Sequence, residues 1–169
     1  MVEVGQKIPD VELWDTEKNP VKLSSYKGKP LVLLFYPGAF TGTCTKEMCT
    51  FRDSMGKFSG MNVVGISVDV PFANKAWKAQ NNINFPLLGD YSREAVRAFN
   101  NYHENFSGMK GYTASKRAVY VLDANQIVCF KWVSENPGVE PDYAIVASEA
   151  EKAKVNVTWC STSTEAEIP

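Results

Sequence analysis

The chain has no apolar stretch close to the roughly 20 residues that a membrane-spanning helix needs. It has no excess of charge, because 18 lysines and arginines face 19 aspartates and glutamates, so neither a nucleic acid nor a strongly cationic partner is indicated. Its first ten residues lack the apolar core of a signal peptide. We therefore expect a soluble, cytoplasmic protein without nucleic-acid or membrane partners.

Histidine occurs once, cysteine four times, and no Cys-x-x-Cys pair is present. In a cytoplasmic chain, cysteines are more often catalytic, redox-active or buried than part of a disulfide framework. The spacing of Cys44 and Cys49 is compatible with zinc, but Cys129 and Cys160 lie far apart and supply no second half-site. We expect neither a metal nor a cofactor.

The length favours one domain over residues 1–160, followed by a small, polar and disordered tail over residues 161–169. Apolar patterning predicts an N-terminal hairpin, central strands, and helices between and after them. The hairpin strands are expected at 11–14 and 21–23, further strands at 31–36, 62–68, 85–88, 117–122 and 127–133, and helices at 43–57, 71–82, 93–101 and 141–154. The fold class is therefore α/β, with a mixed central sheet and helices on both faces.

The most informative segment is the connection that runs from Pro37 to Cys44, between a buried strand and a helix. A cysteine at the first turn of a helix lies where unpaired N–H groups and the helix dipole favour an anion, here the thiolate. Pro37 stiffens the turn, and Gly38 and Gly42 allow close backbone approach. From these residues alone, a buried packing cysteine remains an alternative.

Pro37-x-x-x-Thr41-x-x-Cys44 resembles the active-site motif of the peroxiredoxins, and Cys49 is placed as in their bacterioferritin-comigratory, or peroxiredoxin Q, branch. Segments 5–10, 68–77, 85–90 and 116–123 are similar to other parts of that family. The resemblance implies a thioredoxin-like fold with an N-terminal hairpin extension. It also implies a cofactor-free peroxidase for hydrogen peroxide and organic hydroperoxides, with a role in antioxidant defence. A thioredoxin-like or other dithiol protein is the implied reductant.

Carried over to this chain, the family motif makes Cys44 the peroxidatic nucleophile and Arg117 a second cation that stabilises its thiolate. From the residue alone, a solvent-facing strand arginine is the favoured alternative for Arg117. Thr41 is expected to hydrogen-bond both the thiolate and the peroxide, with a helix N-cap as its alternative role. Pro37 is expected to exclude water. Glu47 lies on the same helical face as Cys44, and we expect it to pair with an arginine and orient it, with a solvated helix glutamate as the alternative.

Cys49 is expected to resolve the sulfenic acid by forming an intramolecular disulfide. Cys160 near the C-terminus and an external thiol are alternative resolvers, and a buried packing role for Cys49 is also open. Cys129 reads as a core residue in a strand. Arg52 is expected at the helix surface, paired with Asp53 or Glu47.

Other classes of function are less well supported. A cysteine protease would pair Cys44 with His103, but an exposed loop histidine is the better interpretation of that residue. A thioredoxin-like disulfide reductase lacks its Cys-x-x-Cys. A redox sensor or chaperone that uses Cys44 only as a switch would not consume peroxide continuously. The sequence leaves open whether the chain is a monomer or a homodimer.

Overall fold

The computed structural model describes residues 2–155, and its centre is a seven-stranded mixed sheet with the order β2-β1-β5-β4-β3-β8-β9. The strands of this sheet are β1 (Glu12–Trp14), β2 (Pro20–Lys22), β3 (Leu31–Phe35), β4 (Asn62–Ser67), β5 (Leu87–Gly89), β8 (Arg117–Leu122) and β9 (Val128–Ser134). A separate antiparallel pair consists of β6 (Tyr102–His103) and β7 (Ala114–Ser115).

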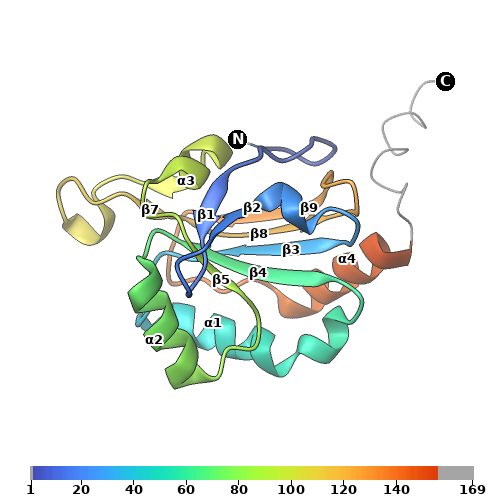
Figure 1. The fold of residues 1–169 in the computed structure, drawn as a ribbon, viewed down its shortest axis with the longest axis horizontal. Coiled ribbons are helices and arrows are strands. Elements are labelled where there is room, and N and C mark those ends of the chain that lie inside the picture. Colours follow the sequence, from blue (N-terminus) through green and yellow to red (C-terminus); the bar gives the residue numbers. More distant parts are fainter. Residues whose placement is uncertain (1, 156–169) are drawn as a thin grey trace.

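The helices are α1 (Gly42–Asp53), α2 (Pro71–Asn81), α3 (Glu94–Phe99) and α4 (Tyr143–Val155), with 3-10 turns η1 (Leu23–Tyr26), η2 (Met55–Phe58) and η3 (Phe106–Gly108). Helices α1, α2 and α4 cover one face of the sheet, and α3 covers the other (Figure 1). Each face has its own apolar cluster, so the sheet is buried on both sides. The predicted mixed sheet with helices on both faces is confirmed.

Strand β3 is fully buried, and it pairs with a strand on each side. It pairs in parallel with β4 across the α1 crossover and antiparallel with β8. The register places Phe35, the last residue of β3, opposite Ala118. Arg117 therefore lies beside the point where the chain leaves β3 toward α1.

The N-terminal hairpin forms as predicted, with β2 at the edge of the sheet. The helix expected at 43–57 ends earlier, at Asp53, and the chain continues through the 3-10 turn η2. The short pair β6 and β7 was not predicted, because two-residue strands are too short to show a period. These strands border a loop that projects from the body of the molecule (Figure 1). The predicted tail and Cys160 lie outside the described residues.

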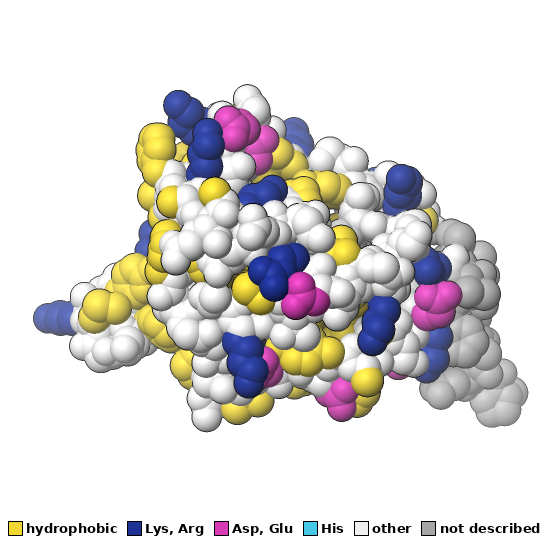
Figure 2. Space-filling view, turned by 90° about the horizontal axis from the view of Figure 1, so that it is seen from below, with side chains coloured by type: hydrophobic (Ala, Val, Ile, Leu, Met, Phe, Trp, Pro, Cys, Tyr) yellow, Lys and Arg dark blue, Asp and Glu magenta, His cyan; other side chains and the backbone are white. Residues whose placement is uncertain are grey.

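The face formed by α1, α2 and α4 carries basic and acidic side chains scattered among apolar and neutral ones (Figure 2). This mixture agrees with the net charge of −1 for the whole chain. Over residues 2–155, no helix combines the length and the apolar character required to cross a membrane.

Candidate active site

Cys44 is the third residue of α1, and its side chain is only 1% exposed. The helix begins after the N-cap residue Thr41, so the free N–H groups of the first turn surround the cysteine. Burial keeps bulk water from the sulfur, while the positive end of the helix dipole offsets part of the cost of a buried anion. The structure thus places Cys44 where the sequence predicts a reactive thiol.

The loop before α1 is held in place from the end of β4. The amide N–H of Ala39 donates to Asp69 Oδ2 over 2.7 Å, and Ser67 Oγ donates to the same oxygen over 2.7 Å. Phe40 has a φ of 63°, an uncommon value for a residue with a side chain, and it is 55% exposed. The loop therefore has a fixed, strained conformation immediately before the cysteine.

Arg117 brings a guanidinium group directly to the cysteine. Its Nη2 donates to Cys44 Sγ over 3.1 Å and to the carbonyl oxygen of Pro137 over 2.8 Å. Its Nε donates to the same carbonyl over 3.2 Å. The side chain is 1% exposed, so the alternative of a solvent-facing strand arginine is wrong. A charge held this firmly beside the sulfur favours the thiolate.

Glu47 completes the contacts of the guanidinium. Arg117 Nη1 donates to Glu47 Oε1 over 3.1 Å, and both side chains are 1% exposed. The other carboxylate oxygen, Oε2, is buried and has no hydrogen-bond partner among the described residues. Burial raises the pKa of Glu47 to about 7, although Arg117 opposes this shift. The predicted pairing of Glu47 with an arginine is therefore present.

A cavity of about 210 Å³ opens onto the cysteine and is lined by Pro37, Thr41, Cys44 and Arg117 together with Phe106 and Pro137. Thr41 occupies the N-cap position but makes no side-chain cap. Instead, its hydroxyl donates to the carbonyl oxygen of Gly38 over 2.7 Å. Its only O–H proton is therefore not directed at the Cys44 sulfur, and its lone pairs remain to accept a hydrogen bond.

Sequence reasoning missed Phe106 and Pro137. Phe106 belongs to the projecting loop, and Pro137 follows β9, so neither is near the cysteine in the chain. A carbonyl acceptor such as that of Pro137 has no signature in the sequence, because every residue has one. Only the fold identifies these two residues as walls of the cavity.

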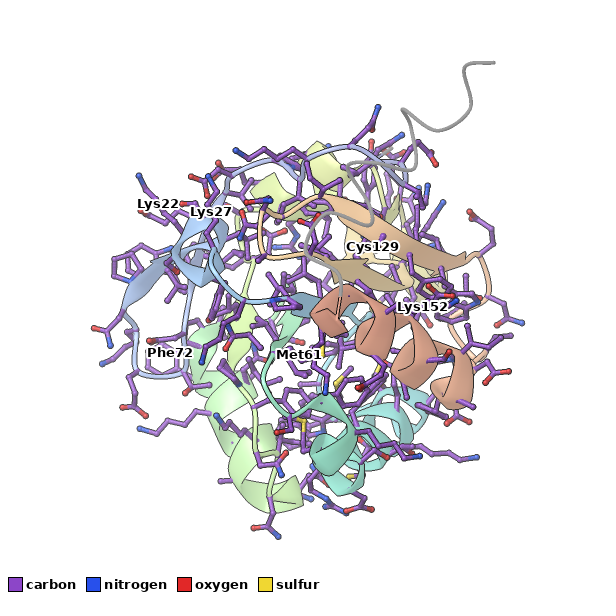
Figure 3. All side chains as sticks on the ribbon, turned by 90° about the vertical axis from the view of Figure 1, so that its right-hand side faces the viewer. Lys22, Lys27, Met61, Phe72, Cys129 and Lys152 are labelled. Atoms are coloured by element: carbon purple, nitrogen blue, oxygen red, sulfur yellow. The ribbon has the colours of Figure 1, made fainter. Side chains whose placement is uncertain are left out.

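Cys49 lies on the same helix but faces a different neighbour. It is partly exposed and its Sγ contacts Asn81 Oδ1 of α2 at 4.0 Å. Cys129 lies partly buried in β9 (Figure 3), packed against the core as predicted. His103 was expected in an exposed loop, but it lies partly buried in β6 and lines a neighbouring cavity without Cys44. Within residues 2–155, no group of three or more His, Cys, Asp and Glu side chains is arranged to hold a metal ion.

The structure has a buried cysteine at the start of a helix, and a buried arginine donates a hydrogen bond to its sulfur beside a mixed sheet. This arrangement is typical of the class of thiol-dependent peroxidases with a thioredoxin-like fold. The comparison with known families agrees: residues 4–131 match the AhpC/TSA family, and the chain belongs to that family. The protein is therefore a peroxiredoxin, an enzyme that reduces peroxides with a cysteine thiol.

Two curated relatives show how far the similarity extends. Peroxiredoxin Bcp of Bacillus subtilis is 35% identical over 133 residues, which cover 78% of this chain and 85% of that protein. The chloroplastic peroxiredoxin Q of Sedum lineare is 40% identical over 129 residues, or 75% of this chain and 67% of that protein. Both names agree with the branch that the spacing of Cys44 and Cys49 resembles.

Solved structures agree on the fold. Peroxidoxin BcpB from Mycobacterium tuberculosis superposes with a TM-score of 0.75 at 28% identity, covering 93% of this chain and 97% of the other. Peroxiredoxin Q from Xanthomonas campestris gives a TM-score of 0.71 at 25% identity, covering 87% and 91%. The predicted thioredoxin-like peroxiredoxin fold is confirmed.

Proposed function

We propose that Cys44 is the peroxidatic nucleophile of this peroxidase. Its thiolate attacks the distal oxygen of a hydroperoxide, the O–O bond breaks, and Cys44 becomes a sulfenic acid. The leaving oxygen departs as an alkoxide or hydroxide and takes up a proton to give an alcohol or water. The observation that carries this proposal is the 3.1 Å hydrogen bond from Arg117 Nη2 to Cys44 Sγ in a site hidden from solvent.

Arg117 acts on both ends of the reaction. Negative charge begins on the sulfur and ends on the leaving oxygen, and a fixed guanidinium beside the sulfur stabilises both positions without reorganising. Pro137 and Glu47 hold this group by accepting from its other N–H groups. Glu47 is thus a positioning residue, because it touches Arg117 rather than the sulfur.

Thr41 and Pro37 shape the place where the peroxide binds. With its proton donated to Gly38, the Thr41 hydroxyl accepts a hydrogen bond from the O–H of the incoming hydroperoxide. Pro37 is buried at the start of the loop between β3 and α1 and offers no N–H to water. The cavity wall of Phe106 and Pro137 is compatible with organic hydroperoxides as well as hydrogen peroxide.

We further propose that Cys49 resolves the sulfenic acid and forms a disulfide with Cys44. Support comes from its free thiol on the same helix and from its partial exposure. Cys160 and an external thiol remain the alternatives, and mass spectrometry of the disulfide-linked peptides after oxidation separates them. A thioredoxin-type dithiol protein then reduces the disulfide. We place the protein in the cytoplasm, where such reductants are kept reduced. A homodimer stays a prediction, which sedimentation velocity tests.

Peroxide consumption with dithiothreitol as reductant tests the proposed function. Cys44→Ser is expected to lose at least nine tenths of the activity while circular dichroism stays unchanged, because a serine hydroxyl is almost never ionised at neutral pH. Thr50→Ser, on the same helix but outside the cavity, serves as the control and should stay active. If Cys44→Ser kept most of its activity, another cysteine would be the nucleophile. If the wild type consumed only one equivalent, the redox-switch alternative would be favoured.

A further inference from the structure

The side of α1 opposite the Arg117 site carries a second arrangement that joins Cys49 to α2. Cys49 Sγ contacts Asn81 Oδ1 at 4.0 Å, the range of a weak hydrogen bond from a thiol. One turn further along α1, Arg52 Nη1 donates to the main-chain oxygen of the same Asn81 over 2.6 Å. Asn81 is thus contacted by two side chains of α1, the thiol of Cys49 and the guanidinium of Arg52.

Each partner in this arrangement is fixed by a second contact. The Asn81 amide donates through Nδ2 to the carbonyl oxygen of Trp77 over 3.0 Å, so its Oδ1 is left facing the thiol. The Arg52 guanidinium is held by Asp53 through Nε at 2.9 Å and Nη2 at 3.2 Å. Residues three apart on a helix are neighbours, so Arg52 lies beside Cys49. The cation and the thiol therefore both contact the same residue of α2, Asn81.

We propose that Arg52 and Asn81 are positioning residues of the resolving step: they hold the thiol of Cys49 in place, next to a positive charge, for attack on oxidised Cys44. The assignment rests on the proposed function, in which Cys49 is the resolving cysteine. An alternative role for Arg52 is to cap the C-terminus of α2. Capping alone, however, does not account for the contact of the Asn81 side chain with the thiol.

The chemistry of the step shows why a cation beside Cys49 matters. The Cys49 thiol loses its proton, and its sulfur attacks the sulfur of the Cys44 sulfenic acid. The S–O bond breaks as the S–S bond forms, and the oxygen leaves as water with the released proton and its own. The Cys49 sulfur is oxidised and the Cys44 sulfur is reduced, so no outside oxidant is needed. The attacking species is a thiolate, and a neighbouring guanidinium favours it.

The contacts of α1 also indicate which half of the helix stays in place. Asn84 Nδ2 donates to the main-chain oxygen of Arg52 over 3.3 Å, adding a further bond between α1 and the chain after α2. The C-terminal half of α1 is thus fastened by Arg52, while the bond from Arg117 to Cys44 is lost when the sulfur is oxidised and moves. In this assignment, Cys44 moves toward Cys49 when the disulfide forms, and Cys49 keeps its position in the helix.

The other ionisable side chains on the two helices are nearly all paired. On α1, Asp53 pairs with Arg52, Lys46 with Glu140 over 3.1 Å, and Glu47 with Arg117. On α2 they are Lys75, which pairs with Glu17 over 3.3 Å, and Lys78. Lys78→Gln therefore measures how much the loss of a positive charge that is not bound to Asn81 changes the rate of the resolving step.

Rapid mixing of the reduced full-length protein with hydrogen peroxide separates the two chemical steps. Tryptophan fluorescence should show a phase that depends on peroxide concentration, then a phase that does not, and acid-quenched mass spectrometry assigns the second to the disulfide. Arg52→Gln is expected to leave the first phase within about twofold. It should slow the second about tenfold at pH 7 and raise its pH midpoint by about one unit, the low end for loss of a nearby opposite charge.

Several variants separate positioning from general stability. Arg52→Lys retains the charge and should recover most of the lost rate, and Asn81→Ala should slow the second phase as well. Asn84→Ala removes a bond to the same helix without touching Cys49, and it should leave the pH midpoint of the second phase unchanged. A slower second phase should also make Cys44 over-oxidise to sulfinic acid at lower peroxide concentrations in Arg52→Gln.

Three results would overturn the assignment. The first is an unchanged rate of the second phase in Arg52→Gln, and the second is a loss of rate that is the same at every pH and is reproduced by Asn84→Ala. The third is a shift of the pH midpoint in Lys78→Gln as large as that in Arg52→Gln. Cys49→Ser distinguishes this failure from failure of the proposed function. A second phase that survives in Cys49→Ser would show that Cys49 is not the resolver. A second phase lost in Cys49→Ser but unchanged in Arg52→Gln would contradict only the roles of Arg52 and Asn81.

Discussion

Arg117 and Cys44 are separated by 73 residues in the chain, yet Arg117 Nη2 lies 3.1 Å from Cys44 Sγ. The antiparallel register of β8 on β3 produces this contact, because Ala118 pairs with the last residue of β3 and Arg117 extends just past it. A single-residue slip would turn the arginine to the other face of the sheet. The geometry of the active site is therefore fixed by strand pairing in the core.

Arg117→Met should lower the second-order rate constant for peroxide by about 10²–10³, the usual effect of removing one preorganised donor. The pH midpoint of this rate should also move upward, since the thiolate loses its cation. Stopped-flow kinetics across pH measures both quantities. Lys116→Met, which removes the neighbouring charge that pairs with Glu135, is the matched control. An unchanged pH–rate profile in Arg117→Met would remove Arg117 from the mechanism.

Glu47→Gln should flatten the pH dependence of stability. Burial raises the pKa of Glu47 to about 7, so the folded protein binds this proton more tightly than the unfolded chain, where the ordinary value is 4.5. The free energy of unfolding must then fall as pH rises from about 4.5 to about 7, by at most about 3 kcal/mol from this group. Asp90 contributes with the same sign, because burial raises its pKa too.

Urea unfolding at pH 5 and pH 7.5 measures the difference that Glu47 makes. The wild type should lose more stability between these two pH values than Glu47→Gln does. The exposed Glu151→Gln is the control and should behave like the wild type. Equal slopes in the wild type and Glu47→Gln would mean that Glu47 is fully ionised across this range.

Thr41→Val should slow peroxide attack more than it destabilises the protein. Valine keeps the shape of threonine but cannot accept a hydrogen bond from the peroxide, and Thr41 makes no side-chain cap whose loss would weaken α1. Thr50→Val on the same helix controls for the change of residue type. A fall in stability of about 1 kcal/mol with an intact rate would instead mean that the Thr41 hydroxyl only stabilises the loop through its bond to Gly38.

The order of the elements and most of the site could be predicted from the sequence. The apolar run of β3, the glycine-containing loop and the patterned helix after it are local signals, and they locate Cys44 and Thr41. The partnership of Arg117 with Cys44 is non-local. From its residue type and strand position alone, Arg117 was predicted to face the solvent, and only the family motif assigned it to the site.

The remaining features depend on packing that no local pattern records. The hydroxyl of Thr41 bonds to Gly38, although a threonine at a helix start usually caps the helix. The Pro137 carbonyl and the Phe106 ring reach the cavity from loops whose course is set by tertiary contacts. The bond from Arg52 to Asn81 joins two helices, whereas the sequence suggested only a pairing of Arg52 with Asp53 or Glu47.

Formation of a Cys44–Cys49 disulfide should unwind the start of α1. Both cysteines lie in one regular helix, where residues five apart are about 140° around the axis and have Cα atoms about 8.7 Å apart. A disulfide needs Cα atoms closer than about 7 Å. The first turns must therefore open, which also breaks the hydrogen bond of 3.1 Å from Trp77 Nε1 to Thr45 Oγ1.

Hydrogen exchange of the reduced and the peroxide-treated protein measures this opening. Protection should be lost over the first turns of α1 and over the preceding loop in the oxidised form, while β3 and β4 keep theirs. Cys49→Ser treated in the same way is the control and should keep its protection. Equal protection over residues 42–53 in both forms, together with a confirmed Cys44–Cys49 disulfide, would show that this helical geometry is wrong.

The central claim is that the Cys44 sulfur is the nucleophile of the first chemical step and takes up the peroxide oxygen as a sulfenic acid, and peptide mass spectrometry tests it most directly. Cys49→Ser is treated with one equivalent of hydrogen peroxide in the presence of dimedone, which traps sulfenic acids. The account predicts one dimedone adduct, located on Cys44, and no adduct when Cys44 is also replaced by serine. An adduct on another cysteine, formed as fast and to the same extent without Cys44, would contradict it.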